Sequence, residues 1–140
     1  MLMSLSPSAA VLLSLVGWSL LLVFLLATVR GLKVLSGRKA VNAFAADGSD
    51  VPGFGQRLTR AYANCLENLP AQAAVLLYAM LAGQTTITDP LAYCLLGARL
   101  LQSCVHMLST SALFVWLRFA SYLVQVLILV WWLLRLSGLL

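Results

Sequence analysis

The stretch AAVLLSLVGWSLLLVFLLATV, from Ala9 to Val29, decides the fold class of this chain. It carries no charge, and its length matches the roughly 20 apolar residues that an α-helix needs to cross a bilayer. The preceding segment, Met1 to Ser8, contains no Lys or Arg, and the apolar run is longer than the hydrophobic region of a secretory signal. We therefore expect a retained membrane-spanning helix over about residues 8–29.

The composition of the whole chain points to the same class. Its 140 residues are 62% hydrophobic and 9% charged, whereas soluble domains carry about 25% charged residues. Thr88, Asp89 and Pro90 predict a helix start, with one of the first two as the cap. We predict a single membrane domain over residues 1–140, all-α, with spanning helices at about 8–29, 56–83, 90–108 and 112–136. The connections near residues 84–89 and 109–111 are short and favour antiparallel neighbours in an up-down bundle.

Charge predicts the orientation of this bundle. The net charge is +5, and six of the nine basic residues lie between Arg30 and Arg60, beside predicted spans. Membrane topology explains that cluster better than nucleic-acid binding does. The positive-inside rule places a loop of about residues 30–55 in the cytoplasm and both termini outside, most simply in a bacterial inner membrane.

Aromatic residues and cysteines receive structural interpretations. Trp116 and the Trp131–Trp132 pair are expected in aromatic belts at opposite membrane interfaces. The three cysteines lie inside predicted helices without metal-ligand spacing, so packing is the expected role of Cys65, Cys94 and Cys104. The sequence predicts no metal site.

Two polar stripes stand out against the apolar background. Side chains three, four and seven residues apart share one face of a helix. On the second helix this spacing joins Arg57, Arg60, Asn64 and Glu67, and on the third it joins Arg99, Gln102 and His106. A charge in the bilayer centre costs about 2.5 to 3.5 kcal/mol on insertion scales, so Glu67 and Arg99 need partners or water. We expect them to pair with each other.

The stripes hold more polar capacity than one ion pair requires. Arg118 on the fourth helix adds another guanidinium on the same side of the membrane. Arg binds carboxylates through two parallel hydrogen bonds, and a carboxylate such as Glu67 can accept an ammonium group. The pattern predicts a pocket open to the cytoplasm for a small zwitterionic ligand that has more carboxylate than amine.

The segment Arg60-Ala-Tyr-Ala-Asn64-Cys-Leu-Glu67-Asn-Leu-Pro70 closely resembles the second-helix signature of the MAPEG family, the membrane-associated proteins in eicosanoid and glutathione metabolism. The spacing of polar residues after Arg99, and Arg118-Phe-Ala-Ser-Tyr122, are similar to its third- and fourth-helix signatures. The resemblance covers all four helices in order. It implies a homotrimer, here of a prokaryotic member, with glutathione held between subunits in a site open to the cytosol.

The resemblance also implies roles for individual residues. The polar ends of glutathione would be bound by Arg60, Asn64, Glu67 and Arg99, with Gln102, His106 and Arg38 as further candidates. Arg118 would stabilise the thiolate that attacks a lipophilic electrophile or a peroxide. Two departures from the family pattern concern this chemistry: Gln102 and His106 stand where members often carry tyrosine, and the interval from His106 to Arg118 is longer than usual.

Two alternative functions stay open from the sequence. A non-catalytic membrane scaffold of the same fold would use the polar cluster only to lock its subunits together. A small multidrug transporter would need a coupling carboxylate, for which Glu67 is the candidate. The transporter ranks last because such proteins typically carry an acidic residue in their first helix, and here that helix is uncharged.

Overall fold

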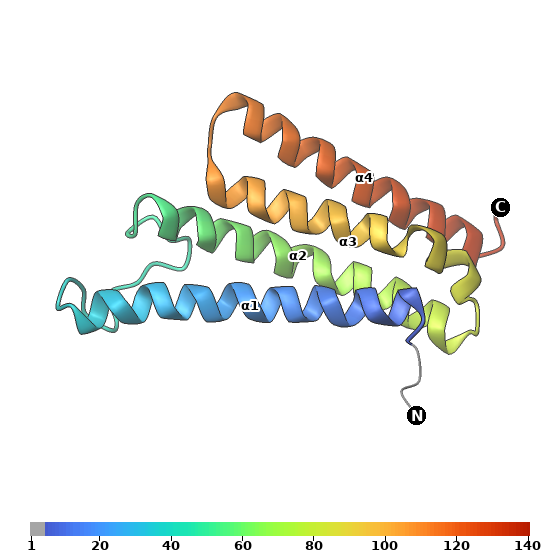
Figure 1. The fold of residues 1–140 in the computed structure, drawn as a ribbon, viewed down its shortest axis with the longest axis horizontal. Coiled ribbons are helices and arrows are strands. Elements are labelled where there is room, and N and C mark those ends of the chain that lie inside the picture. Colours follow the sequence, from blue (N-terminus) through green and yellow to red (C-terminus); the bar gives the residue numbers. More distant parts are fainter. Residues whose placement is uncertain (1–4) are drawn as a thin grey trace.

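The computed structural model describes residues 5–140 and contains four antiparallel α-helices (Figure 1). They are α1 (Pro7–Leu35), α2 (Phe54–Leu81), α3 (Thr85–Leu108) and α4 (Ala112–Leu136). No β-strand occurs in the described residues. The start of α1 and the end of α4 lie at one end of the bundle, and the loop 36–53 lies at the other. The prediction of an all-α up-down bundle is confirmed.

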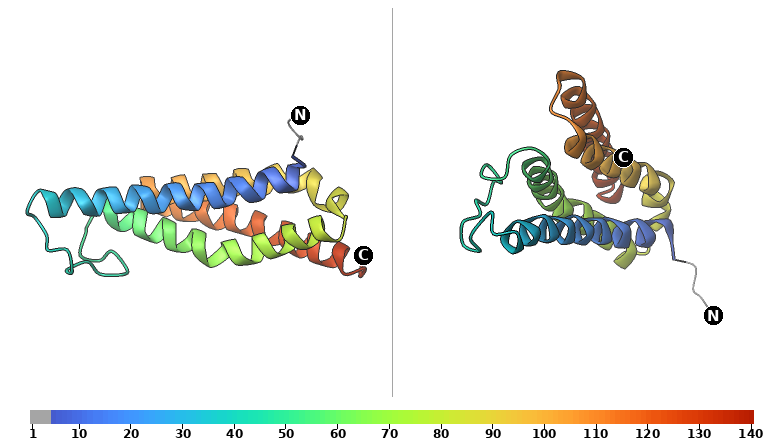
Figure 2. Two further views of the ribbon diagram at one scale, coloured as in Figure 1. Left: turned by 90° about the horizontal axis from the view of Figure 1, so that it is seen from below. Right: turned by 60° about the vertical axis from the view of Figure 1, so that its left-hand side comes forward.

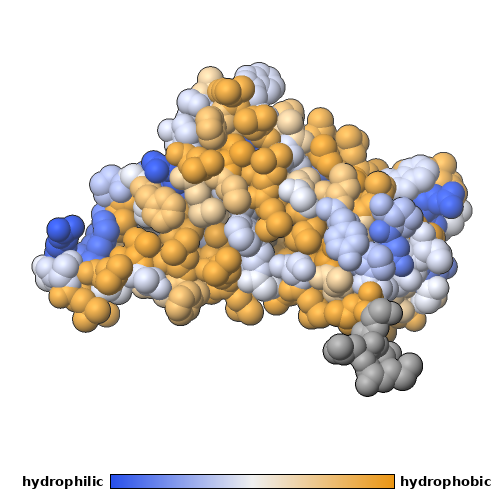
Figure 3. Space-filling model, in the orientation of Figure 1, coloured by the Kyte–Doolittle hydropathy of each residue, from blue (hydrophilic) through white to orange (hydrophobic). Residues whose placement is uncertain are grey.

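Three of the helices, α1, α3 and α4, are long and apolar enough to cross a membrane. α2 has 28 residues and packs against α1 and α3, but its charged and amide side chains lower its hydropathy. Figure 3 shows apolar residues over most of the visible face and the most hydrophilic residues toward the two ends. Apolar surface of this extent is costly in water and matches the interior of a bilayer. The chain is an integral membrane protein.

Two helix boundaries differ from the sequence-based prediction. α1 continues to Leu35, so Arg30 and Lys33 belong to its last turns rather than to the loop. Basic side chains are favourable there because they face the negative end of the helix dipole. α3 begins at Thr85, so Pro90 lies inside this helix and not at its first position.

The side chain of Asp89 bonds to the first turn of α1, whose N-cap is Ser6, and does not cap α3. Its Oδ1 accepts hydrogen bonds from the backbone N–H of Ser8 at 2.9 Å and from Ser8 Oγ at 2.6 Å, and Ser8 Oγ lies 2.6 Å from Thr88 Oγ1. The first N–H groups of a helix have no partner inside that helix. The contact satisfies one of them and fixes the start of α1 against α3. The predicted cap on α3 is therefore wrong, because α3 has already begun at Thr85.

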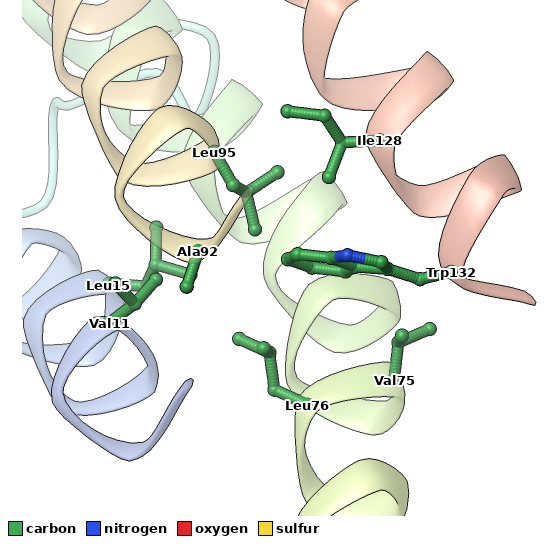
Figure 4. Close-up of a cluster of buried hydrophobic side chains, with 8 residues drawn as sticks. All are labelled: Val11, Leu15, Val75, Leu76, Ala92, Leu95, Ile128 and Trp132. Carbon is green, nitrogen blue, oxygen red and sulfur yellow. The ribbon is translucent and has the colours of Figure 1, made fainter. Parts of the chain in front are cut away.

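Two clusters of buried apolar side chains hold the helices together. The first lies near the chain ends and joins all four helices (Figure 4). The second lies nearer the loop and includes Leu22 and Leu58. Between the two clusters, along α2, α3 and α4, the buried side chains are mostly polar: Gln72, Arg99, Gln102, Ser103, Ser121 and Gln125. Such a layer is costly in a membrane protein unless its members bond to one another.

Trp132 is the largest fully buried side chain of the first cluster. Figure 4 shows its ring among Ile128 of α4 and Val75 and Leu76 of α2. Its expected place in an aromatic belt is therefore wrong, whereas the neighbouring Trp131 is exposed. The two rings point differently because successive helical residues are about 100° apart around the axis.

α4 is the least embedded of the four helices. It packs mainly on α3, touches α2 lightly and, in the part of the chain that is described, makes no close backbone contact with α1. Figure 1 shows α4 diverging from α3 toward the turn at residues 109–111. Figure 2 shows that α2 bends along its length, as expected from Pro70 inside it. Side chains of α2, α3 and α4 near the loop end are thus left partly open.

The loop 36–53 is held by a small cluster of basic and aromatic side chains. Lys39 forms an ion pair with Asp50, and this contact lowers the pKa of the Asp50 carboxyl below its ordinary value. The Arg30 guanidinium and the Lys39 ammonium both lie over the ring of Phe44, at 5.4 and 5.3 Å from its centroid. These contacts tie the loop back to the end of α1.

Candidate functional site

A groove of about 250 Å³ opens where α4 diverges from α3. Side chains of three helices line it: Asn64 from α2, Gln102 and His106 from α3, and Val115, Arg118, Phe119 and Tyr122 from α4. The α3 pair and the pair Arg118 and Tyr122 are each four residues apart, so each pair shares one helix face. Four of the predicted site residues, Asn64, Gln102, His106 and Arg118, therefore meet in one place.

The polar stripe of α2 divides among different surroundings. Asn64 reaches the groove, while Arg60 and Glu67 are exposed on the outside of the subunit. Arg57 donates a hydrogen bond from Nε to the backbone oxygen of Met107 at 2.7 Å, which ties the start of α2 to the end of α3. The stripe is thus one helix face in the sequence but three local environments in the fold.

Arg99 is 2% exposed and lies behind the groove. Its Nη1 donates to Asn64 Oδ1 at 2.9 Å and to Gln102 Oε1 at 3.0 Å. Its Nε and Nη2 have no hydrogen-bond partner among the described residues. A buried cation held only by neutral amides is unusual, because burial of a charge is costly unless an opposite charge lies beside it.

The expected ion pair between Glu67 and Arg99 does not form within the subunit. Glu67 is exposed, and among the described residues the ion pair is Lys39 with Asp50 in the loop. The reason is helical geometry. Asn64 occupies the side of α2 that faces Arg99, and Glu67, three residues further on, lies about 60° around the axis and about 4.5 Å along it, with its side chain exposed.

Two glutamines that the sequence reasoning missed extend the polar layer. Gln125 of α4 donates from Nε2 to Gln102 Oε1 at 2.9 Å and to the backbone oxygen of Ser121 at 2.9 Å. Gln72 of α2 donates from Nε2 to Gln125 Oε1 at 3.1 Å. Both glutamines are 1% exposed. The signal for Gln125 was present in the sequence, since it is a lone amide in the apolar run of α4.

The remaining candidates lie at the margin of the site. Arg38 is exposed in the loop and does not line the groove. His106 is half-buried, within range of the Arg60 and Arg118 charges. Cys65 is buried with its Sγ 3.2 Å from Ser103 Oγ, and all three cysteines are free thiols. In the described residues no group of three His, Cys, Asp or Glu side chains is placed to hold a metal ion.

The groove is suited to an anionic ligand. Arg118 supplies a fixed positive charge, and no carboxylate of the described residues is among its lining side chains. Arginine and amide N–H groups bind carboxylates and thiolates through charge-assisted hydrogen bonds. A larger cavity of about 400 Å³ lies near the chain ends between α2 and α4. Its lining includes no charged side chain and consists of Ala74, Val75, Tyr78, Leu133, Leu136 and Ser137. The smaller groove is therefore the candidate site.

The groove also adjoins an apolar cavity on the outside of α4. This cavity of about 360 Å³ is lined by Val115, Trp116 and Phe119, and two of these residues also line the groove. The Trp116 and Phe119 rings meet edge to face, with centroids 6.1 Å apart. A polar site thus lies beside a surface that a bilayer would cover.

Comparison with known proteins agrees with this architecture. The MAPEG family pattern matches residues 8–138, which is nearly the whole chain. No curated protein and no solved structure matches the chain. The match begins in the first turn of α1 and ends just beyond α4, so it includes all four helices and every lining residue of the groove. The chain belongs to the MAPEG family.

Proposed function

We propose that the protein is a membrane-bound glutathione transferase or peroxidase that acts on lipophilic electrophiles. Membership of the MAPEG family supports a glutathione-related membrane function in general. The observation that carries the finer proposal is the groove itself, where Arg118 lies with Asn64, Gln102 and His106 beside an apolar cavity. One part of the site can hold a thiolate and the adjoining part an apolar substrate.

Arg118 is the proposed catalytic residue. A guanidinium close to a thiol stabilises the thiolate and raises its fraction at neutral pH. In a transferase reaction the glutathione sulfur forms a bond to the electrophilic carbon, and the leaving group departs with the bonding electron pair. In a peroxidase reaction the sulfur attacks one peroxide oxygen and the O–O bond breaks. The released alcohol takes up a proton, and a second glutathione completes a disulfide and releases water.

Calorimetric titration of the detergent-purified protein with glutathione tests the proposal, with conjugation to a chromogenic electrophile measured beside it. Arg118→Ala should lower the turnover by about 100-fold, as for loss of one charge-stabilising group, and should change glutathione affinity much less. Arg135→Ala is the matched control, because Arg135 is exposed in the last turn of the same helix. Absence of glutathione binding by the parent protein would sink the proposal.

The proposed assembly is a homotrimer with glutathione between subunits. Arg60 and Glu67 support it, since both are charged, exposed and on α2, where lipid contact would be costly. In a trimer they can face a neighbouring subunit or the ligand. Native mass spectrometry should report three subunits. A monomer in every mild detergent would contradict this assembly.

The exposed charges on α2 also favour a second candidate, the non-catalytic scaffold. Under that function Arg60→Ala and Glu67→Ala would dissociate the oligomer, and the parent would bind no glutathione. Proton-coupled efflux from reconstituted vesicles would instead support the transporter, with Glu67 as its coupling carboxylate. Glutathione binding together with conjugation of an electrophile would support the enzyme over both alternatives.

We propose a bacterial inner-membrane location with the loop 36–53 in the cytoplasm and both termini outside. Five basic residues support this orientation, because they lie near the loop end of the bundle: Arg30, Lys33, Arg38, Lys39 and Arg57. A cysteine introduced at Ser49, with the native cysteines replaced by serine, tests it. Membrane-impermeant maleimide should label inverted vesicles and leave intact cells unlabelled, and the opposite result would reverse the topology.

A further inference from the structure

The buried hydrogen bonds behind the groove have a fixed direction. Arg99 is a donor only, because a guanidinium has no acceptor atom. The atoms that face its Nη1 must therefore be the oxygens of the Asn64 and Gln102 amides, as observed at 2.9 and 3.0 Å. Arg99 thus decides which end of each amide turns inward.

The orientation of the Gln102 amide in turn determines the orientations of the Gln125 and Gln72 amides. Gln102 Oε1 also meets Gln125 at 2.9 Å, so the Gln125 atom there must be its nitrogen. The oxygen of Gln125 then faces Gln72 at 3.1 Å, and the Gln72 atom must again be a nitrogen. The buried Arg99 cation thus orients all three glutamine amides of this hydrogen-bonded series, Gln102, Gln125 and Gln72. Aligned hydrogen bonds of this kind polarise and strengthen one another.

The orientation leaves the NH2 groups of Asn64 and Gln102 without a partner among the described residues. Neither nitrogen is one of the buried atoms that lack a hydrogen bond, so both are accessible. Both residues line the groove, as does Arg118 of α4. Two amide donors and one guanidinium therefore converge on the same space.

We infer that Arg99 is a positioning residue that turns the amides of Asn64 and Gln102 so that both present N–H donors to the groove, with Gln125 and Gln72 locking this arrangement. The inference rests on the proposed glutathione site, and it replaces direct ligand contact by Arg99. It assigns the ligand group at this wall to the acceptor-only class, a carboxylate. A carboxamide in its place would direct its own NH2 group toward the NH2 groups of Asn64 and Gln102, and two donors cannot form a hydrogen bond with each other.

The first test does not need a ligand. Side-chain NH2 resonances of the detergent-solubilised protein, assigned from single substitutions, are compared with and without a soluble paramagnetic agent. The NH2 signals of Gln102 and Asn64 should broaden, while those of Gln72 and Gln125 should be protected. Protection of the Gln102 NH2 together with broadening at Gln125 would overturn the inference, whether or not glutathione binds.

The second test uses Gln102→Glu. A carboxylate at this position still accepts from Arg99 and Gln125, so the buried bonds persist, but it offers the groove an acceptor instead of a donor. Glutathione binding should weaken by roughly 10-fold to 100-fold, the effect of one lost hydrogen bond to a charged group. Gln84→Glu is the control for added charge, since Gln84 is exposed before α3. It should leave the affinity unchanged.

Discrimination between ligands separates positioning from a merely structural role. The probes are glutathione and its two monoamides, each with one carboxylate replaced by a carboxamide. The parent should reject one monoamide, and Arg99→Met should lose most of that preference, because the amides of Asn64 and Gln102 are then free to turn. Equal weakening of all three ligands, or parent-like binding by Gln102→Glu, would overturn the inference. If the parent binds no glutathione, the proposed function fails, and the resonance test still decides the orientation.

Discussion

Arg99→Met should leave the stability of the protein nearly unchanged while disabling the groove. Arg99 donates two hydrogen bonds, each worth about 1.5 to 3 kcal/mol for a charged donor. Against this stands the cost of burying a guanidinium with no carboxylate beside it, on the order of several kcal/mol. The two contributions are of similar size, so we expect the free energy of unfolding to change by less than about 2 kcal/mol.

The assay is reversible unfolding in mixed detergent micelles, followed by helical circular dichroism, with glutathione titration of the same sample. Binding should fall at least as far as for Gln102→Glu, because both groove amides become free to turn. Arg99→Lys is the matched variant: a single ammonium keeps the charge but cannot hold both amides in the fork geometry. A loss of about 3 to 5 kcal/mol on Arg99→Met would refute the reasoning, since that is the cost of breaking a true buried ion pair. It would mean that another subunit supplies a carboxylate to Arg99.

Three further predictions concern the frame around the site. Trp132→Ala should destabilise the protein by about 3 to 5 kcal/mol, because it empties the centre of the first apolar cluster. Trp116→Ala should change unfolding by less than about 0.5 kcal/mol, because that ring is exposed. Asp89→Ala should cost about 1 to 2 kcal/mol and speed amide exchange in the first turn of α1, where its hydrogen bond to the Ser8 N–H is lost. Lys39 lowers the pKa of Asp50 in the folded protein. The Lys39–Asp50 pair therefore stabilises the folded loop fully above the pKa of an unfolded Asp, about 3.9, and this stabilisation is lost as the pH falls through the lower pKa of the folded state. Proteolysis of the loop should accelerate in that acidic range. Asp50→Asn should weaken this pH dependence, leaving the part due to Asp47, whose pKa is lowered by hydrogen bonds from Ser49.

The helices were predictable because apolar runs of bilayer length admit few other structures. The starts and ends were not, because they depend on contacts distant in the sequence. Asp89 looked like the cap of its own helix, and nothing in the local sequence shows that its carboxylate would instead accept hydrogen bonds from Ser8. Trp132 was misplaced for a similar reason, since periodicity along α4 does not say which neighbour covers which face.

For the site, helical spacing grouped Gln102 with His106, and the position of Arg118 along its helix placed it on the same side of the membrane. The structure brings the three side chains to one groove. It misjudged the pairing of Arg99, because it treated charge as the property that seeks a partner. The structure bonds one nitrogen of this cation to two amides and leaves Glu67 outside. Gln72 and Gln125 escaped notice because a single amide in a membrane helix has meaning only when its partner on another helix is known.

This arrangement explains how a wholly helical membrane protein can keep a polar site stable without sealing it. The cation lies at 2% exposure behind the amides, where water and lipid do not reach it, and the amides carry its influence into the groove as oriented donors. A side chain that reaches the groove without a partner behind it, such as Arg118, is free to turn toward solvent, whereas the amides held by Arg99 keep one orientation before a ligand arrives. Preorganised donors of this kind lose little entropy on binding. The divergence of α4 then sets how wide the groove opens, so the affinity for the anionic end of a ligand and the access of an apolar substrate are controlled by different elements of the same fold.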